Sequence, residues 1–441
     1  MGCVFLALAL YLASPAAMAM DWIMFFGSEP DRLQRDGRQV ENRDTTPHLL
    51  GFVQSQYVRN QSTPLETAGL NRTSFAYVFP DLERRSKADV SRAKLGARGM
   101  LDADNRFNYF LLTEFGHNGL TEPLGHEEDP VHLTDASLSL RLTPGVRLKL
   151  GRFYAPIADE AHDVLISPYA SYTSFTQTQI QESFVWTAAA ASVGGVSLRT
   201  GLPAAPSAAF HDSGVQVFDA LPWGENASLT YALMWGQGSG VSGWHGGNSD
   251  EAFLYLAHER YLGQRLPWFT ESFKVFGWGQ TGTRHVDGDR DYRRTRYGVG
   301  ANWRQDRLRL GGEYMRARGM VQSGIVDTDA TPNVQNWALQ FAPSGGNTAS
   351  GGYLDAGWRV LPQLELCVRY DWMDLLPDSA ALHKEFDNWT FGASYRIKGP
   401  VRVDLNYVLK QAKAPDSPAA QTVLDRLGNE VSLRLTYFIS L

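Results

Sequence analysis

Cysteine is nearly absent from this 441-residue sequence, which contains only Cys3 and Cys367. Two cysteines so placed exclude a disulfide framework, a cysteine-rich zinc site and a C-x-x-C-H haem attachment. A surplus of basic charge is also missing, because 41 Lys and Arg stand against 47 Asp and Glu, for a formal net charge of −6. This balance argues against a nucleic-acid binder, which usually shows an excess of basic charge.

Beyond its N-terminus the sequence has no apolar run of the 18 residues or so that a membrane-spanning helix needs. Residues 3–13 are almost wholly apolar, Ser14-Pro15 ends the run, and Ala17-Met18-Ala19 matches the small-x-small pattern that signal peptidase cleaves. No Lys or Arg precedes the run, and a first transmembrane helix is the alternative. We expect residues 1–19 to be a signal peptide and the protein to be exported.

Catalytic signatures are absent as well. The sequence has no G-x-S-x-G, no H-E-x-x-H and no G-x-x-x-x-G-K-[ST]. One cluster, His126-Glu127-Glu128-Asp129, has the residue types that bind a divalent cation, although a solvated loop is the simpler interpretation. We therefore expect no enzyme activity, no cofactor and no metal site.

Glycine and aromatic residues are plentiful, with 42 Gly and 12% aromatic residues. This combination suits many twisted, tightly turned strands. Along 401–409 every second residue is apolar, and Arg402, Asp404 and Asn406 lie between them. The same alternation runs through 364–372 and 389–397, so each segment has one apolar face and one polar face.

Segments of about ten residues with this alternation have the length of a tilted strand that crosses a bilayer. We predict sixteen of them, near 49–59, 91–101, 106–117, 132–143, 146–153, 212–220, 227–236, 250–260, 270–280, 293–303, 307–316, 351–360, 364–373, 388–397, 401–410 and 429–441. A closed sheet satisfies every backbone N–H and C=O inside hydrocarbon.

The connections between these strands alternate strictly between short and long. Short turns rich in Pro, Gly, Asn and Asp fall at 102–105, 144–145, 221–226, 261–269, 304–306, 361–363 and 398–400. Long polar loops fall at about 60–90, 118–131, 154–211, 237–249, 281–292, 317–350, 374–387 and 411–428. Short periplasmic turns and long external loops are typical of an outer-membrane barrel.

The predicted fold class is therefore all-β, a transmembrane antiparallel β-barrel of about 16 strands over 49–441. We expect residues 20–48 to form a charged N-terminal periplasmic segment, and residues 29 to 47 show no hydrophobic period. A secreted β-sandwich or β-helix is the alternative, but neither needs its long loops on one side.

If the apolar positions face lipid, the intervening ones face the interior. Sixteen basic residues then point inward against eight acids. The basic residues are Arg92, Lys94, Arg98, Arg141, Arg147, Lys149, Lys274, Arg294, Arg296, Arg309, Arg359, Arg369, Arg396, Arg402, Lys410 and Arg434. The acids are Glu114, Asp135, Glu313, Asp355, Glu365, Asp371, Asp404 and Glu430.

Low-dielectric walls focus the field of such charges onto an aqueous channel, which favours anions. Eleven of the basic residues are our candidate pore lining: Arg92, Lys94, Arg98, Arg141, Arg147, Lys149, Lys274, Arg294, Arg296, Arg369 and Arg402. The alternative for any one of them is that it pairs with an inward acid and braces the wall.

The longest loop, 154–211, is rich in Ser, Thr, Tyr and Gln over 166–181. A loop of this length in an ordered protein usually has a function. We expect it to fold into the barrel as a constriction, with Tyr169, Tyr172, Thr176 and Gln179 as candidate lining residues. An external flap is the alternative, and 185–198 is predicted as an extra hairpin around Gly194-Gly195.

Short motifs occur in order between residues 50 and 441. They are Arg92-Ala93-Lys94-Leu95-Gly96-Ala97-Arg98-Gly99, Asp135-Ala136, Gly151-Arg152-Phe153-Tyr154-Ala155-Pro156, Ser213-Gly214-Val215-Gln216, Arg369-Tyr370-Asp371, Asp387-Asn388-Trp389-Thr390 and Leu405-Asn406-Tyr407. Together they resemble the phosphate-selective (O/P-type) porin family of Gram-negative outer membranes. The resemblance implies an often trimeric porin that passes small anions through an arginine-rich lumen.

One departure from that family concerns selectivity. Its phosphate-selective members carry arginines on the inserted loop, whereas 154–181 has none and contains Asp159, Glu160 and Asp163. The resemblance therefore supports the barrel and leaves phosphate selectivity unsupported.

The function expected from the sequence is a passive outer-membrane channel with an anion preference, for which phosphate and other oxyanions are candidate solutes. Its expected partners are outer-membrane lipid and lipopolysaccharide, small anionic solutes and two further copies in a homotrimer, but no nucleic acid. Two alternatives remain: a barrel that sheathes partner proteins such as electron-transfer cytochromes, and an outer-membrane lipid hydrolase.

Overall fold

The computed structural model describes residues 32–35, 38–63, 86–115, 131–162, 167–181, 184–203, 210–224, 226–238, 250–266, 269–286, 289–324, 339–397 and 400–440. The expected signal peptide, the His126-Glu127-Glu128-Asp129 cluster and Asp163 lie outside the described residues.

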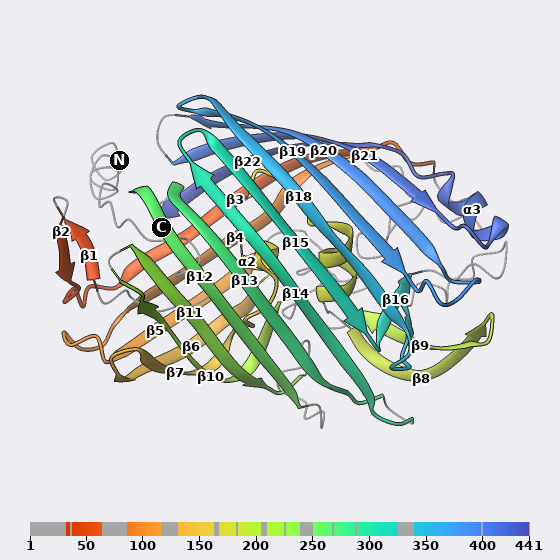
Figure 1. The fold of residues 1–441 in the computed structure, drawn as a ribbon, viewed down its shortest axis with the longest axis horizontal. Coiled ribbons are helices and arrows are strands. Elements are labelled where there is room, and N and C mark those ends of the chain that lie inside the picture. The colour runs from red at the N-terminus through yellow and green to blue at the C-terminus, as the bar shows by residue number, and fades with distance from the viewer. Residues whose placement is uncertain are drawn as a thin grey trace.

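Sixteen antiparallel strands form a closed barrel, in which β22 pairs with β3 and β7 pairs with β10 (Figure 1). The strands are β3 (His48–Asn60), β4 (Ser86–Met100), β5 (Phe107–Phe115), β6 (His132–Thr143), β7 (Val146–Tyr154), β10 (His211–Pro222), β11 (Ala227–Gly236), β12 (Glu251–Leu266), β13 (Phe269–Arg284), β14 (Tyr292–Gln305), β15 (Leu308–Arg318), β18 (Thr348–Leu361), β19 (Leu364–Leu375), β20 (Lys384–Ile397), β21 (Val401–Lys413) and β22 (Glu430–Ser440). All sixteen predicted strands are confirmed.

Several strands are longer than predicted, chiefly at the end that carries the long loops. β4 begins at Ser86, β13 continues to Arg284, and β20 begins at Lys384. At the other end, the connection predicted at 261–269 is shorter than predicted, because β12 continues to Leu266 and β13 begins at Phe269. A register shift between Tyr261 and Arg265 lets β12 continue past its irregular stretch.

The outer face of the barrel is apolar. Exposed positions along the strands hold residues such as Leu95, Leu150, Val299 and Leu405, and they alternate with buried polar ones. Exposed aromatic residues stand toward both ends of the strands, as in membrane barrels, where they mark the two interfaces. Because water would disfavour this belt and lipid accommodates it, the barrel spans a membrane.

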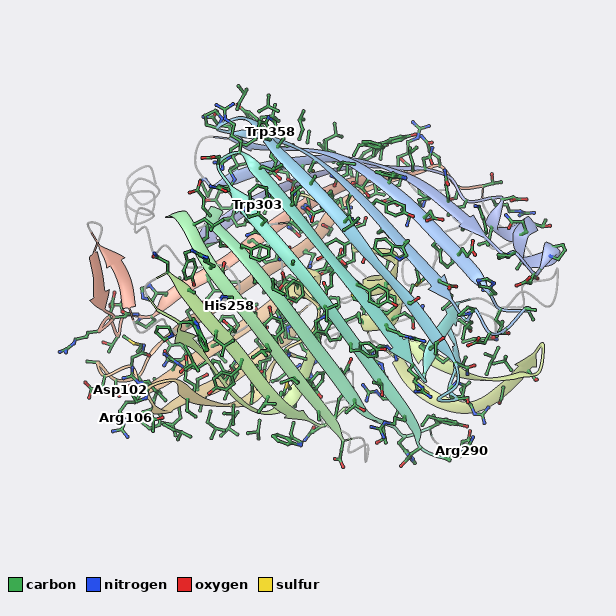
Figure 2. All side chains as sticks on the ribbon, viewed as in Figure 1. Asp102, Arg106, His258, Arg290, Trp303 and Trp358 are labelled. Carbon is green, nitrogen blue, oxygen red and sulfur yellow. The ribbon has the colours of Figure 1, made fainter. Side chains whose placement is uncertain are left out.

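The two ends of the barrel differ in the length of their connections. Figure 2 shows Trp303, Trp358 and His258 toward the short-turn end, and Arg290, which lies in the loop from β13 to β14, at the opposite end. No helix in the described part of the chain is long and apolar enough to cross a membrane.

The long excursion between β7 and β10 contains the helix α2 (Asp159–His162), the π-helical turn η3 (Thr176–Ile180), and strands β8 (Phe184–Val193) and β9 (Val196–Pro203). The predicted extra hairpin is confirmed, because β8 and β9 pair across Gly194 and Gly195, whose φ angles of 54° and 81° suit glycine. This hairpin joins β16 (Val321–Gly324) and β17 (Leu339–Ala342) in a separate four-stranded sheet at the long-loop end.

Three further elements complete the described chain. Strands β1 (Arg32–Arg35) and β2 (Arg38–Glu41) pair as a hairpin within the stretch from 29 to 47, for which the sequence shows no hydrophobic period. The helix α3 (Pro418–Leu424) lies in the loop between β21 and β22.

Candidate functional site: the inserted segment inside the barrel

The structure places the eleven candidate pore-lining residues on the inward face of the strands. Nine of them are buried: Lys94, Arg98, Arg147, Lys149, Lys274, Arg294, Arg296, Arg369 and Arg402. Arg92 and Arg141 are half-buried. Burial of so many cations requires partners, because a charge removed from water without one is costly.

Many of these partners come from the first half of the 154–211 excursion. We call residues 155–181 the inserted segment; 163–166 within it lie outside the described residues. Its side chains and carbonyls contact inward-facing residues of β12, β13, β14, β19, β21 and β22. The segment therefore lies inside the barrel.

Asp159 anchors α2 to one side of the wall. Its Oδ1 accepts hydrogen bonds from Lys274 Nζ at 2.8 Å and Tyr255 Oη at 3.2 Å. Its Oδ2 accepts one from Asn302 Nδ2 at 2.6 Å. Asp159 is 3% exposed, so these donors replace the water that a carboxylate requires.

Glu160 anchors the same helix to the other side. Its Oε1 accepts hydrogen bonds from Arg369 Nη1 at 3.0 Å and Thr173 N at 2.8 Å, and its Oε2 accepts one from Thr173 Oγ1 at 2.6 Å. Burial raises the pKa of the Glu160 carboxyl, while Arg369 and the Thr173 donors oppose that shift. Arg369 also donates to Ser171 O at 2.9 Å and lies 4.4 Å from the centre of the Tyr169 ring.

The middle of the inserted segment is held by β21 and β22. Arg434 donates to Tyr169 O at 2.9 Å and to Ser167 O at 2.7 Å, and Arg402 donates to Ser167 O at 2.9 Å. Asp404 accepts from both arginines at 2.9–3.0 Å. These guanidinium groups thus bridge a wall carboxylate and the carbonyls of the segment.

The end of the segment is held in the same way. Arg296 Nε donates to Gln179 O at 2.8 Å, and Arg294 Nη2 donates to the same carbonyl at 3.0 Å. Two residues before η3, the backbone N–H and the hydroxyl of Ser174 donate to Asp371 Oδ1 at 3.0 and 2.9 Å. Carbonyls at the end of η3 therefore find donors that a free loop would take from water.

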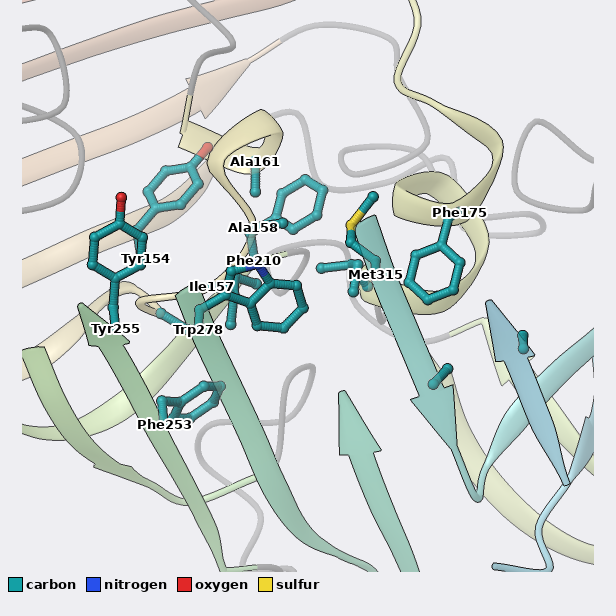
Figure 3. Close-up of a cluster of buried hydrophobic side chains, with 14 of the residues drawn as sticks. Tyr154, Ile157, Ala158, Ala161, Phe175, Phe210, Phe253, Tyr255, Trp278 and Met315 are labelled. Carbon is teal, nitrogen blue, oxygen red and sulfur yellow. The ribbon is translucent and has the colours of Figure 1, made fainter. Parts of the chain in front are cut away.

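Apolar packing fixes the segment as well. Figure 3 shows Ala158, which directly precedes α2, and Ala161 of α2 on the same turn as Ile157 and above Trp278, with Phe175 beside Met315. These six residues belong to one buried hydrophobic cluster that combines the inserted segment with the inner wall. The inner wall is thus partly apolar, whereas the interior of a water-filled membrane barrel is usually polar.

The four predicted lining residues of the loop all lie in this segment. Tyr169, Thr176 and Gln179 are buried, and Tyr172 is half-buried, with its hydroxyl 3.3 Å from Arg92 Nη1. Inside the barrel they contact the wall, and their contact with a solute stays a prediction.

Other cations brace the wall itself. Glu114 of β5 accepts Arg92 Nε at 3.0 Å, and Lys94 Nζ lies 3.3 Å from the other oxygen of the same carboxylate. Arg147 Nε lies 3.5 Å from Asp219 Oδ2. Bracing, the alternative to pore lining, therefore applies to these three cations.

The two ends of the excursion meet on the wall. Tyr154 pairs with His211 in the β7–β10 ladder, their rings lie 4.0 Å apart, and Ala155 N donates to Phe210 O at 2.8 Å. His211 Nε2 lies 3.1 Å from Asp135 Oδ2. The barrel ladder is therefore continuous beneath the excursion.

Sequence parity missed several inward acids. Asp212, Asp219 and Glu251 are each no more than 4% exposed, and both carboxylate oxygens of Glu251 accept from Arg284 Nη2 at 2.8 Å. On β12 the inward side holds Phe253 as well, so both faces are apolar and the alternation that reveals orientation is lost. Parity also missed the inward bases Arg284 and Lys384, which are 2% and 7% exposed, so the basic surplus counted from the sequence changes little.

Metal-binding potential is low in the part of the chain that the structure describes, where no group of three or more His, Cys, Asp or Glu side chains has a geometry that would hold a metal ion. Asp159 and Glu160 of the inserted segment and Asp371 of the wall instead accept hydrogen bonds from lysine, arginine and hydroxyl donors.

Comparison with known protein families finds no matching family, and comparison with curated protein sequences finds no match. Solved structures do match. Salmonella typhi OmpF in complex with daunomycin superposes with a TM-score of 0.55 at 14% identity, covering 92% of this chain and 99% of that one. The loop L8 deletion mutant of OmpT, an outer membrane protein of Vibrio cholerae, gives 0.51 at 10% identity, covering 90% and 100%.

Pseudomonas putida OprB at high pH gives a TM-score of 0.50 at 8% identity, covering 89% of this chain and 94% of that one. At these identities the likeness establishes a shared fold. It is a likeness to outer-membrane porins, whereas the phosphate-selective type stays a prediction.

Proposed function

We propose that this protein is a porin, a passive outer-membrane channel for small hydrophilic solutes with a modest preference for anions. The observation that carries the proposal is the inserted segment, bound inside a sixteen-stranded barrel by arginine and lysine side chains. A barrel of this strand number is wide enough to leave an aqueous channel, and a segment across it sets the size of what passes.

The anion preference is supported by the residues around the segment. Arg92 and Lys94 share the carboxylate of Glu114, and Arg402 and Arg434 share that of Asp404. In both groups the cations outnumber the carboxylate they share, and a low-dielectric wall focuses the resulting positive potential inward. Asp159, Glu160 and the inward acids of β10 and β12 offset part of it. We therefore expect a weak preference for anions. Phosphate or another oxyanion is our candidate for the specific solute.

The test is single-channel recording in a planar bilayer with a KCl gradient. A reversal potential of the sign for chloride preference supports the proposal, and one for potassium preference overturns the anion part. Absence of any conductance overturns the channel itself. Addition of phosphate to one side then tests for a binding oxyanion, which would reduce the chloride current at millimolar concentrations.

A sheath for partner proteins has less support. A partner that enters the barrel would have to displace the inserted segment and its buried contacts to Lys274 and Arg369. Haem absorbance in the purified protein would nevertheless favour that alternative over the channel.

A further inference from the structure

Three arginines stand together on the outer face of the barrel at the long-loop end: Arg293 of β14 and Arg316 and Arg318 of β15. All three are exposed, and they alternate with the buried residues Met315 and Ala317. They therefore point away from the barrel interior. We call them the outer arginine patch.

The register sets the height of the patch relative to the membrane. Arg316 pairs with Tyr297 of the neighbouring strand, and Arg318 pairs with Thr295. Tyr297 and Tyr314 are 43% and 44% exposed, and Val299 and Leu310 continue the apolar belt below them. Since a strand rises about 3.4 Å per residue, Arg316 stands about 7 Å beyond Tyr314.

Exposed tyrosines on a membrane barrel mark the level where hydrocarbon ends and headgroups begin. Arg316 stands level with Tyr297, and Arg293 and Arg318 follow on the long-loop side. The guanidinium groups of the outer arginine patch are therefore placed at the height of the headgroups of the outer leaflet.

The positive charge of the patch is not neutralised by the described residues. Arg318 Nε donates to Gly345 O at 2.7 Å and Arg293 Nη2 to Thr281 Oγ1 at 3.2 Å, both neutral acceptors, and Arg316 has no hydrogen bond or ion pair with any described residue. The acids of the loop just above have other partners: Asp289 accepts from Arg199 and Tyr292, and Asp291 from His285.

The outer rim is not uniformly basic. On β19 and β20, two and three strands beyond β15 in the barrel, the residues at the outer edge are Asp374, Glu385 and Asp387, which are half-buried and acidic. An anionic headgroup would be repelled there and attracted at β14 and β15. The patch is thus a local feature of one side of the barrel.

We propose that the outer arginine patch binds the phosphate groups of the glycolipid that forms the outer leaflet, lipopolysaccharide. Arginine presents a planar fork of N–H donors that matches phosphate oxygens in pairs. The acyl chains of the same molecule would lie against the apolar belt below Tyr297 and Tyr314. The proposal is independent of what the channel passes.

The experiment compares the full-length protein with the triple variant Arg293→Gln/Arg316→Gln/Arg318→Gln in phosphatidylcholine vesicles that contain bisphosphorylated lipid A. Bound lipid A per barrel is measured by native mass spectrometry after detergent extraction. Basic residues near an anionic lipid surface contribute about 1 kcal/mol each, so binding should weaken about a hundredfold. The control replaces three exposed arginines at the short-turn end, Arg106, Arg260 and Arg307, by glutamine and should bind like the wild type.

Removal of the phosphates from lipid A should reproduce the loss with the wild-type protein. Equal binding by wild type and triple variant, equal binding of dephosphorylated lipid A, or the same loss in the control would overturn the proposal. If the triple variant instead lost a defined oligomer while it kept lipid A, the patch would be a contact between copies of the chain. Arg316→Gln alone removes no described contact, so a severalfold loss in that variant supports the proposal independently of folding.

Discussion

The ion pair between Arg369 and Glu160 is predicted to hold the inserted segment against the wall. In Arg369→Gln the Glu160 carboxylate would keep only its Thr173 donors, and Ser171 O would lose its guanidinium partner. Both members of the pair are at least nine-tenths buried. Removal of one partner from a buried pair costs about 3–5 kcal/mol, and about 1.4 kcal/mol is a factor of ten in an equilibrium.

The ratio of docked to undocked segment should therefore fall by about two to nearly four orders of magnitude. The chain carries its own reporter, because Cys367 lies two residues before Arg369, is 7% exposed, and has Tyr169 of the inserted segment close to it. In a Cys3→Ser background, the rate at which a maleimide labels Cys367 follows the population of the undocked segment. We expect this rate to rise by the same factor in Arg369→Gln, together with a larger single-channel conductance.

Two controls make the result specific. Glu160→Gln/Arg369→Gln leaves no unpaired buried charge, so its labelling rate should return most of the way to the wild-type value. Arg260→Gln, on the exposed outer face of β12, should leave the rate unchanged. Wild-type labelling in Arg369→Gln, or equal acceleration in Arg260→Gln, would show that the pair does not hold the segment.

Three further predictions concern other contacts of the segment and the outer sheet. Arg294→Gln/Arg296→Gln should free the end of η3 and raise channel noise, whereas quiet openings would contradict that role. Gly351→Ala should displace Phe175, since the added Cβ would meet its Cδ2 at 3.1 Å and a backbone oxygen at 2.5 Å. The cost is about 1–3 kcal/mol, measured as a lower denaturant midpoint; an unchanged midpoint would show that the site relaxes freely.

Hydrogen bonds from Tyr292 and Arg199 lower the pKa of Asp289 to about 2. Because the folded-state pKa is depressed, this link between Arg199 of β9, in the four-stranded sheet, and Tyr292 of β14 should persist from neutral pH to about pH 4 and weaken as the pH falls toward about 2. Proteolysis of 184–203 at graded pH measures it, and Asp289→Asn should show the acid behaviour already at pH 7.

Local alternation made the barrel predictable. On β21, Arg402, Asp404 and Asn406 point inward between apolar residues, so strand type, orientation and membrane exposure follow from the same few residues. The turns followed from Pro, Gly, Asn and Asp. Where both faces of a strand are apolar, as on β12, the orientation could not be read from sequence.

The contacts of the site were beyond local pattern. Asp159 meets Lys274 and Glu160 meets Arg369 across more than a hundred residues of sequence. The stretch 317–350 was predicted as loop, yet it contains β16 and β17. β17 pairs with β9, which is distant in sequence, so the local sequence pattern could not predict this strand. Composition indicated that the excursion is polar and functional. Which wall cation pairs with each of its carboxylates depends on the three-dimensional arrangement of the closed barrel.

Because Tyr154 pairs directly with His211, the hydrogen-bonded ladder of the barrel does not depend on the excursion between these two residues. A shortened chain that joined Ala155 to Phe210 would keep every rung from β3 to β22, because no barrel strand takes a backbone pairing from the residues in between. The excursion therefore behaves as a cassette. Its replacement by a segment of other length or charge would change the width and the charge of the channel while the wall assembles as before. This position is therefore suited to the engineering of pores.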